Sequence, residues 1–186
     1  HQRDHPDFLF LLAQLSERQG RVANAGELYE RLIERCPNNA HFHLGFAQYL
    51  KIQDRADDAE RHFRRSITLE PTLLEAKYYL AMLLLSTGRH GEAVAYGEGL
   101  VSANKRQSKY WELLAAAHQR SDQLQSAISI CERGLSFCPK SPRLSYSLAQ
   151  LLRERCDFER AALAYQAAKE LGFQSPALYQ NYSEAL

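Results

Sequence analysis

The sequence predicts an all-α fold built from repeated helical hairpins, and three observations support this prediction. Pro71 follows Pro37 by 34 residues, and Pro139 follows Pro71 by 68. Apolar residues recur at helical spacing inside each 34-residue period, with one break near the middle. Two columns of alanine keep the same period: Ala13, Ala47, Ala81, Ala115 and Ala149, then Ala25, Ala59, Ala93, Ala127 and Ala161.

Each period contains a first helix, a turn, a second helix and a stop. The first helix surrounds the first alanine of the period, as in the pattern Leu80, Leu83 and Leu84. Glycine or aspartate near the break suits a helix-ending turn, and the closing proline stops the second helix. The turn residues are Gly20, Asp54, Gly88 and Asp122. We expect two helices to cross closely at each alanine, because a methyl group fits there and a larger side chain would force the helices apart.

The periods divide residues 1–186 into a single array. Five hairpins are expected at about 6–39, 40–73, 74–107, 108–141 and 142–175, followed by a helix over 176–186 that either caps the array or opens a sixth repeat. Gly97 and Gly99 interrupt the third period, and Lys105 stands where other periods have proline. The helix near 92–103 should therefore be less protected from hydrogen exchange than the one near 57–69.

Composition excludes several functional classes. Lys and Arg number 23 against 22 Asp and Glu, so the net charge of +1 does not predict nucleic-acid binding. Apolar runs such as Leu80–Leu85 are too short to cross a bilayer, so we expect no membrane insertion. The expected location is cytoplasmic. The arginines at 61, 64 and 65 have acidic neighbours and should form a solvated face.

The cysteines and histidines do not predict a metal site or a cofactor. The four cysteines lack C-x-x-C spacing and are expected to be free thiols that pack inside the fold: Cys36, Cys131, Cys138 and Cys156. His41 and His43 are two residues apart and do not share a helix face. No phosphate loop, nucleophile elbow or other catalytic pattern is present, so the segment itself is not expected to be an enzyme.

These columns resemble the tetratricopeptide repeat (TPR) family. Trp111, Leu114 and Ala115 match the first signature of that repeat, and the stretches 25–29 and 59–63 match the second. Pentatricopeptide repeats, which bind RNA, differ in having a period of 35. The resemblance implies a right-handed α-solenoid whose first helices line a concave groove that binds a peptide or protein segment.

Groove-lining positions of the family can be transferred residue by residue. The expected peptide-binding residues are Phe10, Gln14, His41, Gln48, Glu75, Tyr78, Met82, Lys109, Glu112, Arg143, Tyr146 and Gln150. Some family members clamp the C-terminal carboxylate of chaperones with cations and asparagines. The matching positions here include Phe10, Gly45 and Glu75, so this clamp is not expected.

The resemblance implies a non-catalytic scaffold for protein–protein interaction. The alternative is a substrate-recruiting domain of a larger glycosyltransferase, hydroxylase or sulfotransferase, because TPR arrays accompany such enzymes. Self-association through the apolar ends of the solenoid is a further expectation.

Overall fold

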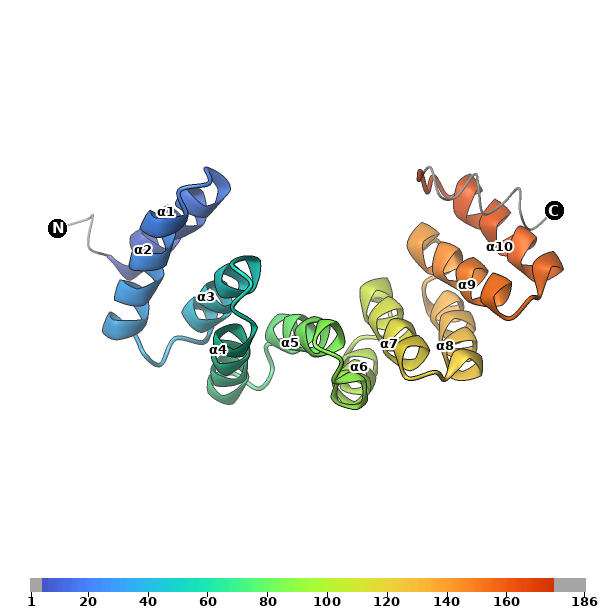
Figure 1. Cartoon of the computed structure of the whole chain (residues 1–186), viewed down its shortest axis with the longest axis horizontal. Helices are drawn as coiled ribbons and strands as arrows, with labels where there is room; N and C mark the ends of the chain where they lie inside the picture. The colour runs from blue at the N-terminus through green and yellow to red at the C-terminus, as the bar shows by residue number, and fades with distance from the viewer. Residues whose placement is uncertain (1–4, 176–186) are drawn as a thin grey trace. The chain divides into compact units, whose positions relative to one another are not determined.

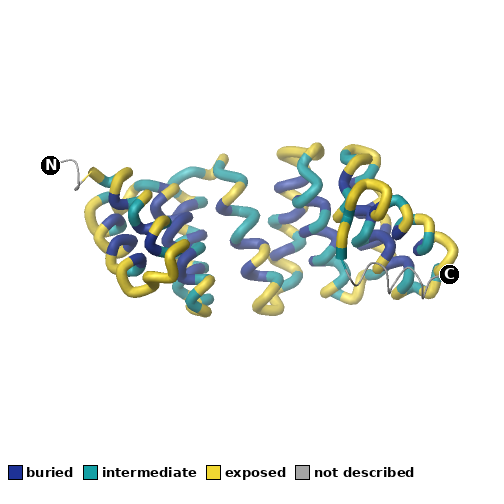
Figure 2. Tube along the Cα trace, turned by 90° about the horizontal axis from the view of Figure 1, so that it is seen from above, coloured by how far each residue is buried: buried dark blue, intermediate teal, exposed yellow. Residues whose placement is uncertain are grey.

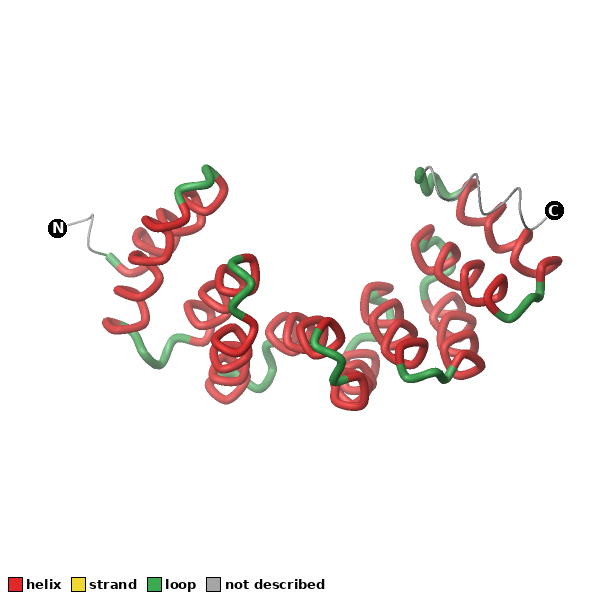
Figure 3. The backbone as a smooth tube through the Cα atoms, in the orientation of Figure 1, coloured by secondary structure: helices red, strands yellow, loops and turns green. Residues whose placement is uncertain are grey.

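The computed structural model describes residues 5–175, which contain ten α-helices and no strand (Figures 1 and 3). The helix expected over 176–186 lies outside the described residues. The helices are α1 (Pro6–Arg18), α2 (Val22–Arg35), α3 (Ala40–Ile52), α4 (Ala56–Leu69), α5 (Leu74–Ser86), α6 (His90–Ala103), α7 (Ser108–Arg120), α8 (Leu124–Phe137), α9 (Pro142–Glu154) and α10 (Phe158–Glu170).

The chain divides into two compact units, residues 1–83 and 84–186, and the division falls inside α5. In the N-terminal unit, α1 packs on α2 and α3 on α4, while α3 also contacts α1 and α2. In the C-terminal unit, α7 packs on α8 and α9 on α10, α6 packs on α7, and α8 on α9. The two first helices α7 and α9 also touch each other, so they form a continuous surface.

The alanine columns mark the places where helices meet, as predicted. Nine of the ten alanines have no exposed surface, and Ala115 is 2% exposed. Large side chains fill the space beside them, including Tyr29, Phe63, Trp111 and Tyr165, each at most 1% exposed. Figure 2 shows buried residues along the helices and exposed residues at the turns within each unit.

The turn inside each hairpin requires a left-handed backbone. Its φ is 71° at Gly20, 59° at Asp54, 81° at Gly88 and 58° at Asp122, which explains the glycine and aspartate of this column. Cys156 continues the column with φ of 62° and an exposed side chain. The expectation that all four cysteines pack inside the fold is therefore wrong for Cys156. Cys131 is buried, and burial raises the pKa of its thiol to about 12.

We predict that Cys156→Gly stabilises the C-terminal unit by about 1 kcal/mol, because a β-carbon is unfavourable in the left-handed region. Cys156→Ser keeps the β-carbon and serves as the control, with little expected change. Chemical denaturation monitored by circular dichroism measures both variants. Equal stability of the glycine and serine variants would show that this turn is not strained.

The two glycines of α6 have different surroundings. A β-carbon at Gly97 would lie 3.0 Å from Leu114 Cδ1, whereas one at Gly99 would meet nothing within 4 Å. We predict that Gly99→Ala stabilises α6 by about 1 kcal/mol through helix propensity alone, and that Gly97→Ala gains less. Hydrogen exchange of 92–103 reads out both. The same gain in the two variants would contradict the close approach of α6 to α7.

The basic cluster of α4 is paired, as expected of a solvated face. Arg61 forms an ion pair with Asp58. Arg64 Nε lies 2.8 Å from Glu60 Oε1, and Arg65 donates a hydrogen bond of 2.8 Å to Asn38.

A histidine pair joins α3 and α4, and the sequence did not predict it. His43 is buried; its Nε2 lies 3.0 Å from the carbonyl oxygen of Pro37, and its Nδ1 lies 2.9 Å from His62 Nδ1. A carbonyl oxygen only accepts, so His43 Nε2 donates to Pro37 and a neutral His43 accepts from His62. The rings stack with centroids 5.1 Å apart.

This pair predicts a loss of stability in acid. Burial, then the nearby His43 and Arg61, lower the pKa of His62 to about 4, against an opposing effect of Asp58. An unfolded histidine titrates near pH 6.5, so the neutral folded form contributes stability above that pH, which is lost as the pH falls towards 4. We expect the melting temperature to fall across this range, and to fall less in His62→Phe. Parallel profiles of the two proteins would contradict this assignment.

Candidate protein-binding surface

In the N-terminal unit the expected groove residues lie on α1, α3 and α5. Phe10 is half-buried, with its ring 5.2 Å from that of Phe42 and 6.2 Å from that of Tyr29. A β-carbon at Gly45 would lie 2.5 Å from the Phe10 ring, so this glycine makes room for it. Phe10 thus packs α1 against α3. His41 is exposed, and its Nδ1 lies 3.7 Å from Glu70.

The other expected residues of this unit are more accessible. Gln14 and Gln48 are half-buried, Glu75 is exposed, and Met82 is 36% exposed. Tyr78 is half-buried and makes an edge contact with Tyr79 at 5.5 Å between ring centroids.

In the C-terminal unit the contact of α7 with α9 brings the expected residues together. Arg143 Nε on α9 lies 3.3 Å from Glu112 Oε2 on α7. The Glu112 side chain is 17% exposed, and burial raises the pKa of its carboxyl group although Arg143 acts in the opposite direction. Lys109, one turn earlier, lies over the Tyr110 ring at 5.6 Å. This end of the surface therefore carries a partly buried ion pair.

Tyr146 has a packing contact as well as an exposed part. Its ring stacks on Phe173 at 4.5 Å and lies 5.8 Å from the ring of Tyr165. Its hydroxyl accepts a hydrogen bond of 3.2 Å from Gln150, which is exposed. An alanine at 146 would remove packing along with any contact to a partner.

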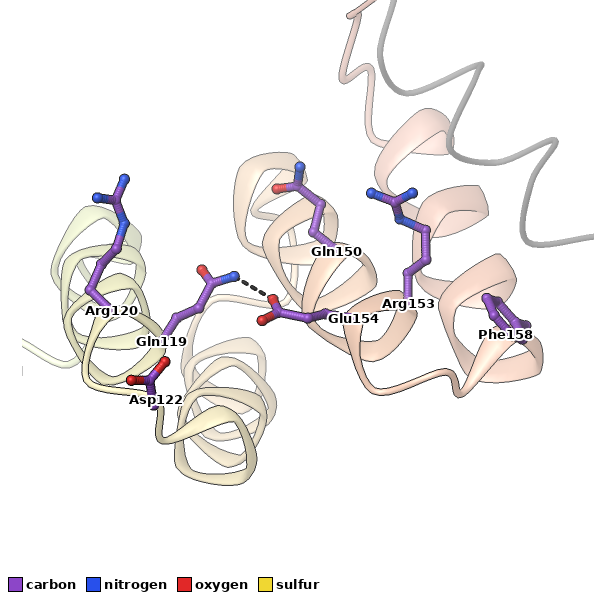
Figure 4. Close-up of a pocket in the computed structure, with 7 residues that line it drawn as sticks. All are labelled: Gln119, Arg120, Asp122, Gln150, Arg153, Glu154 and Phe158. Atoms are coloured by element: carbon purple, nitrogen blue, oxygen red, sulfur yellow. Dashed lines mark hydrogen bonds between the residues drawn. The ribbon is translucent and has the colours of Figure 1, made fainter.

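The C-terminal ends of α7 and α9 and the start of α10 enclose an open pocket of about 950 Å³. Gln119 donates a hydrogen bond of 2.6 Å to Glu154 across the pocket. In Figure 4 the side chains of Arg120, Gln150 and Arg153 all extend to the same side of this bond. We call this the α7/α9 pocket; it is lined by Gln119, Arg120, Asp122, Gln150, Arg153, Glu154 and Phe158.

Only Gln150 of this lining was expected from the sequence. The transferred positions stop near the middle of each first helix, whereas the pocket lies at its last turn. The period contained the missing signal, because Gln119 and Arg153 are 34 residues apart, as are Arg120 and Glu154. The same two positions of consecutive repeats therefore face each other.

The chemistry of the surface suits recognition. Arginine, glutamine and carboxylate groups line the pocket, with the Phe158 ring at its edge, and they can hydrogen-bond a peptide main chain and its side chains. Within residues 5–175, no group of three or more metal-binding side chains comes together, and no helix has the length and apolar character needed to cross a membrane.

Residues 9–136 match the family model of the cilia and flagella-associated protein 70 middle TPR-like domain. The chain therefore belongs to this family of TPR-like domains, and the predicted all-α TPR fold is confirmed. Such a fold supports protein–protein interaction in general.

Two curated relatives illustrate the range of proteins that contain similar segments. Mouse protein O-mannosyl-transferase TMTC1 is 28% identical over 109 residues, which cover 56% of this chain and 12% of the relative. Anaphase-promoting complex subunit 7 of Arabidopsis thaliana is 25% identical over 162 residues, which cover 87% of this chain and 29% of the relative. The chain thus spans less than a third of the length of either relative.

Solved structures share the fold at low identity. MamA from Desulfovibrio magneticus RS-1 superimposes with a TM-score of 0.79 at 19% identity, covering 90% of this chain and 95% of that one. Pseudomonas aeruginosa PilF has a TM-score of 0.79 at 15% identity, and the match covers 97% of this chain and 88% of PilF. YrrB, described as a TPR protein with an unusual peptide-binding site, has a TM-score of 0.73 at 14% identity, and the match covers 98% of this chain and 93% of YrrB.

Proposed function

We propose that the chain is a non-catalytic module that binds an extended segment of a partner protein along its first helices. The observation that carries this proposal is the α7/α9 pocket, where Arg120 and Gln150 are exposed beside hydrogen-bonding groups of both polarities. A mixed apolar and charged peptide fits such a lining, because its main chain and side chains both find partners.

The proposal includes, within each compact unit, the groove residues expected from the sequence. The residues already expected on α1, α3, α5, α7 and α9 would contribute side contacts, with Phe10 and Tyr146 acting mainly through packing. Membership of this family favours a parent protein associated with cilia or flagella, and a cytoplasmic location remains part of the proposal.

Site-specific photocrosslinking tests this function. A benzophenone amino acid at Gln150 should capture a defined partner from an extract of ciliated cells, while the same group at Leu163, 63% exposed on α10, should not. Arg120→Glu with Gln150→Ala should weaken binding of that partner at least tenfold, about 1.4 kcal/mol, without changing helicity. Capture at Leu163 alone, or unchanged affinity of the double variant, would refute the proposal.

The second candidate is a substrate-recruiting domain of a larger enzyme, favoured by the similarity to an O-mannosyl-transferase. In that case Arg120→Glu in the full-length parent should raise KM for a protein acceptor and leave kcat unchanged. A parent without glycosyltransferase, hydroxylase or sulfotransferase activity would remove this candidate and leave the scaffold function in place.

A further inference from the structure

The C-terminal unit has a second groove on the side of its second helices. It lies between α6 and α8, over α7, and has a volume of about 670 Å³. Leu114 and Ile130 supply apolar surface to it, and Trp111 and Phe137 form one end. We call it the α6/α8 groove. None of its lining residues belongs to the α7/α9 pocket.

Aromatic rings and cations are combined at that end. The rings of Trp111 and Phe137 stack at 5.7 Å with an angle of 11°. Lys105 Nζ lies 5.5 Å from the centre of the Phe137 ring, and the Arg133 guanidinium lies 5.8 Å from that of Trp111. The indole nitrogen of Trp111 donates a hydrogen bond of 2.8 Å to the carbonyl oxygen of Lys105, which fixes the position of the loop.

Both cations are accessible. Lys105 and Arg133 are exposed, and neither has a carboxylate partner in the part of the chain that the structure describes. The Phe137 ring, over which Lys105 lies, is 43% exposed. Glu98 on α6 is the carboxylate that lines the same groove.

The corresponding positions of the N-terminal unit have different chemistry. Shifting by two periods places His43 at Trp111, His62 at Ile130 and Pro37 at Lys105. There the two histidines hydrogen-bond to each other, and His43 also donates to the carbonyl oxygen of Pro37. The lysine that departs from the proline column thus lies at the end of the groove where Trp111 stacks on the exposed Phe137.

We propose that the α6/α8 groove is a second protein-binding surface, specific for an acidic segment with an apolar anchor. The anchor packs on Phe137 and the floor at Leu114, and the acidic side chains pair with Lys105 and Arg133. Charge complementarity favours this partner, because two cations held over aromatic rings lack carboxylates of their own. The proposal is independent of the function of the α7/α9 pocket.

Trp111 is the single tryptophan of the chain and provides the test. The probe is a synthetic twelve-residue peptide with Asp at four positions around a central Leu-Phe pair. It is titrated into the protein at low salt, and the fluorescence of Trp111 is measured. We expect a saturable change that is absent with the isosteric peptide in which Asn replaces every Asp. High salt should weaken the binding, because exposed charges are screened.

Two matched variants locate the binding. The double variant Lys105→Glu with Arg133→Glu should bind the Asp peptide at least tenfold more weakly. This variant keeps the hydrogen bond from Trp111, because the acceptor is the backbone carbonyl oxygen of residue 105. Arg120→Glu with Gln150→Ala changes only the α7/α9 pocket and should bind the Asp peptide normally. Absence of a fluorescence change up to millimolar peptide, equal binding of the Asn peptide, or full binding by the first variant would overturn the proposal.

Discussion

Phe63→Ala is expected to destabilise the N-terminal unit by about 3–5 kcal/mol, the largest effect of any single change proposed for this chain. Phe63 has no exposed surface, and its ring stacks with that of Tyr79 at 6.3 Å between centroids and an angle of 10°. Alanine would leave a cavity that rigid neighbouring helices cannot close. The lost contacts and the cavity therefore add.

Guanidinium denaturation followed by circular dichroism measures the loss, and hydrogen exchange locates it in α4 and α5. Phe8→Ala is the matched control, because Phe8 is 45% exposed on α1 and should change stability by less than about 1 kcal/mol. Similar losses in the two variants would mean that Phe63 is not part of a closely packed core.

The same position explains why one repeat differs from the others. The 34-residue column contains Tyr29, Phe63, Gly97, Cys131 and Tyr165, all buried. At Gly97 the missing side chain is compensated by close approach of α6 to Leu114. The sequence alone indicates the exception, but it does not show whether a cavity or a closer helix contact results, since that depends on how neighbouring helices adjust.

Features with one-dimensional periodicity were predictable from the sequence. The helices, the turn residues and the buried alanines all recur every 34 residues, and each has a local physical cause in helix contact or backbone conformation. Cys156 was misassigned although it continues the turn column after Asp122. Its residue type, usual in cores, outweighed its position.

Features that depend on several helices were not predictable. The His43–His62 pair joins residues 19 apart on two helices, and the α7/α9 pocket depends on a hydrogen bond between residues 35 apart. Hydrophobic spacing fixes which face of a helix is inward, yet it leaves the crossing geometry open. Polar contacts between helices are decided by that geometry.

Ala127→Leu is expected to destabilise the C-terminal unit by about 1–3 kcal/mol. Ala127 lies near the start of α8 and has no exposed surface. Leucine adds three carbon atoms at a contact between helices, so α8 has to shift or its neighbours have to leave favoured rotamers. The gain in buried apolar area cannot offset this strain, because the site has no space for the added atoms.

Ala103→Leu is the matched control, since Ala103 is exposed in the last turn of α6 and the same substitution should change stability by less than about 0.5 kcal/mol. Thermal and denaturant unfolding of both variants measure the difference. If Ala127→Leu were tolerated as well as Ala103→Leu, the second alanine column would reflect helix propensity alone. Both variants replace alanine by leucine in a helix, so the change in helix propensity is the same in each. The difference in stability between them therefore measures the effect of the helix contact at Ala127.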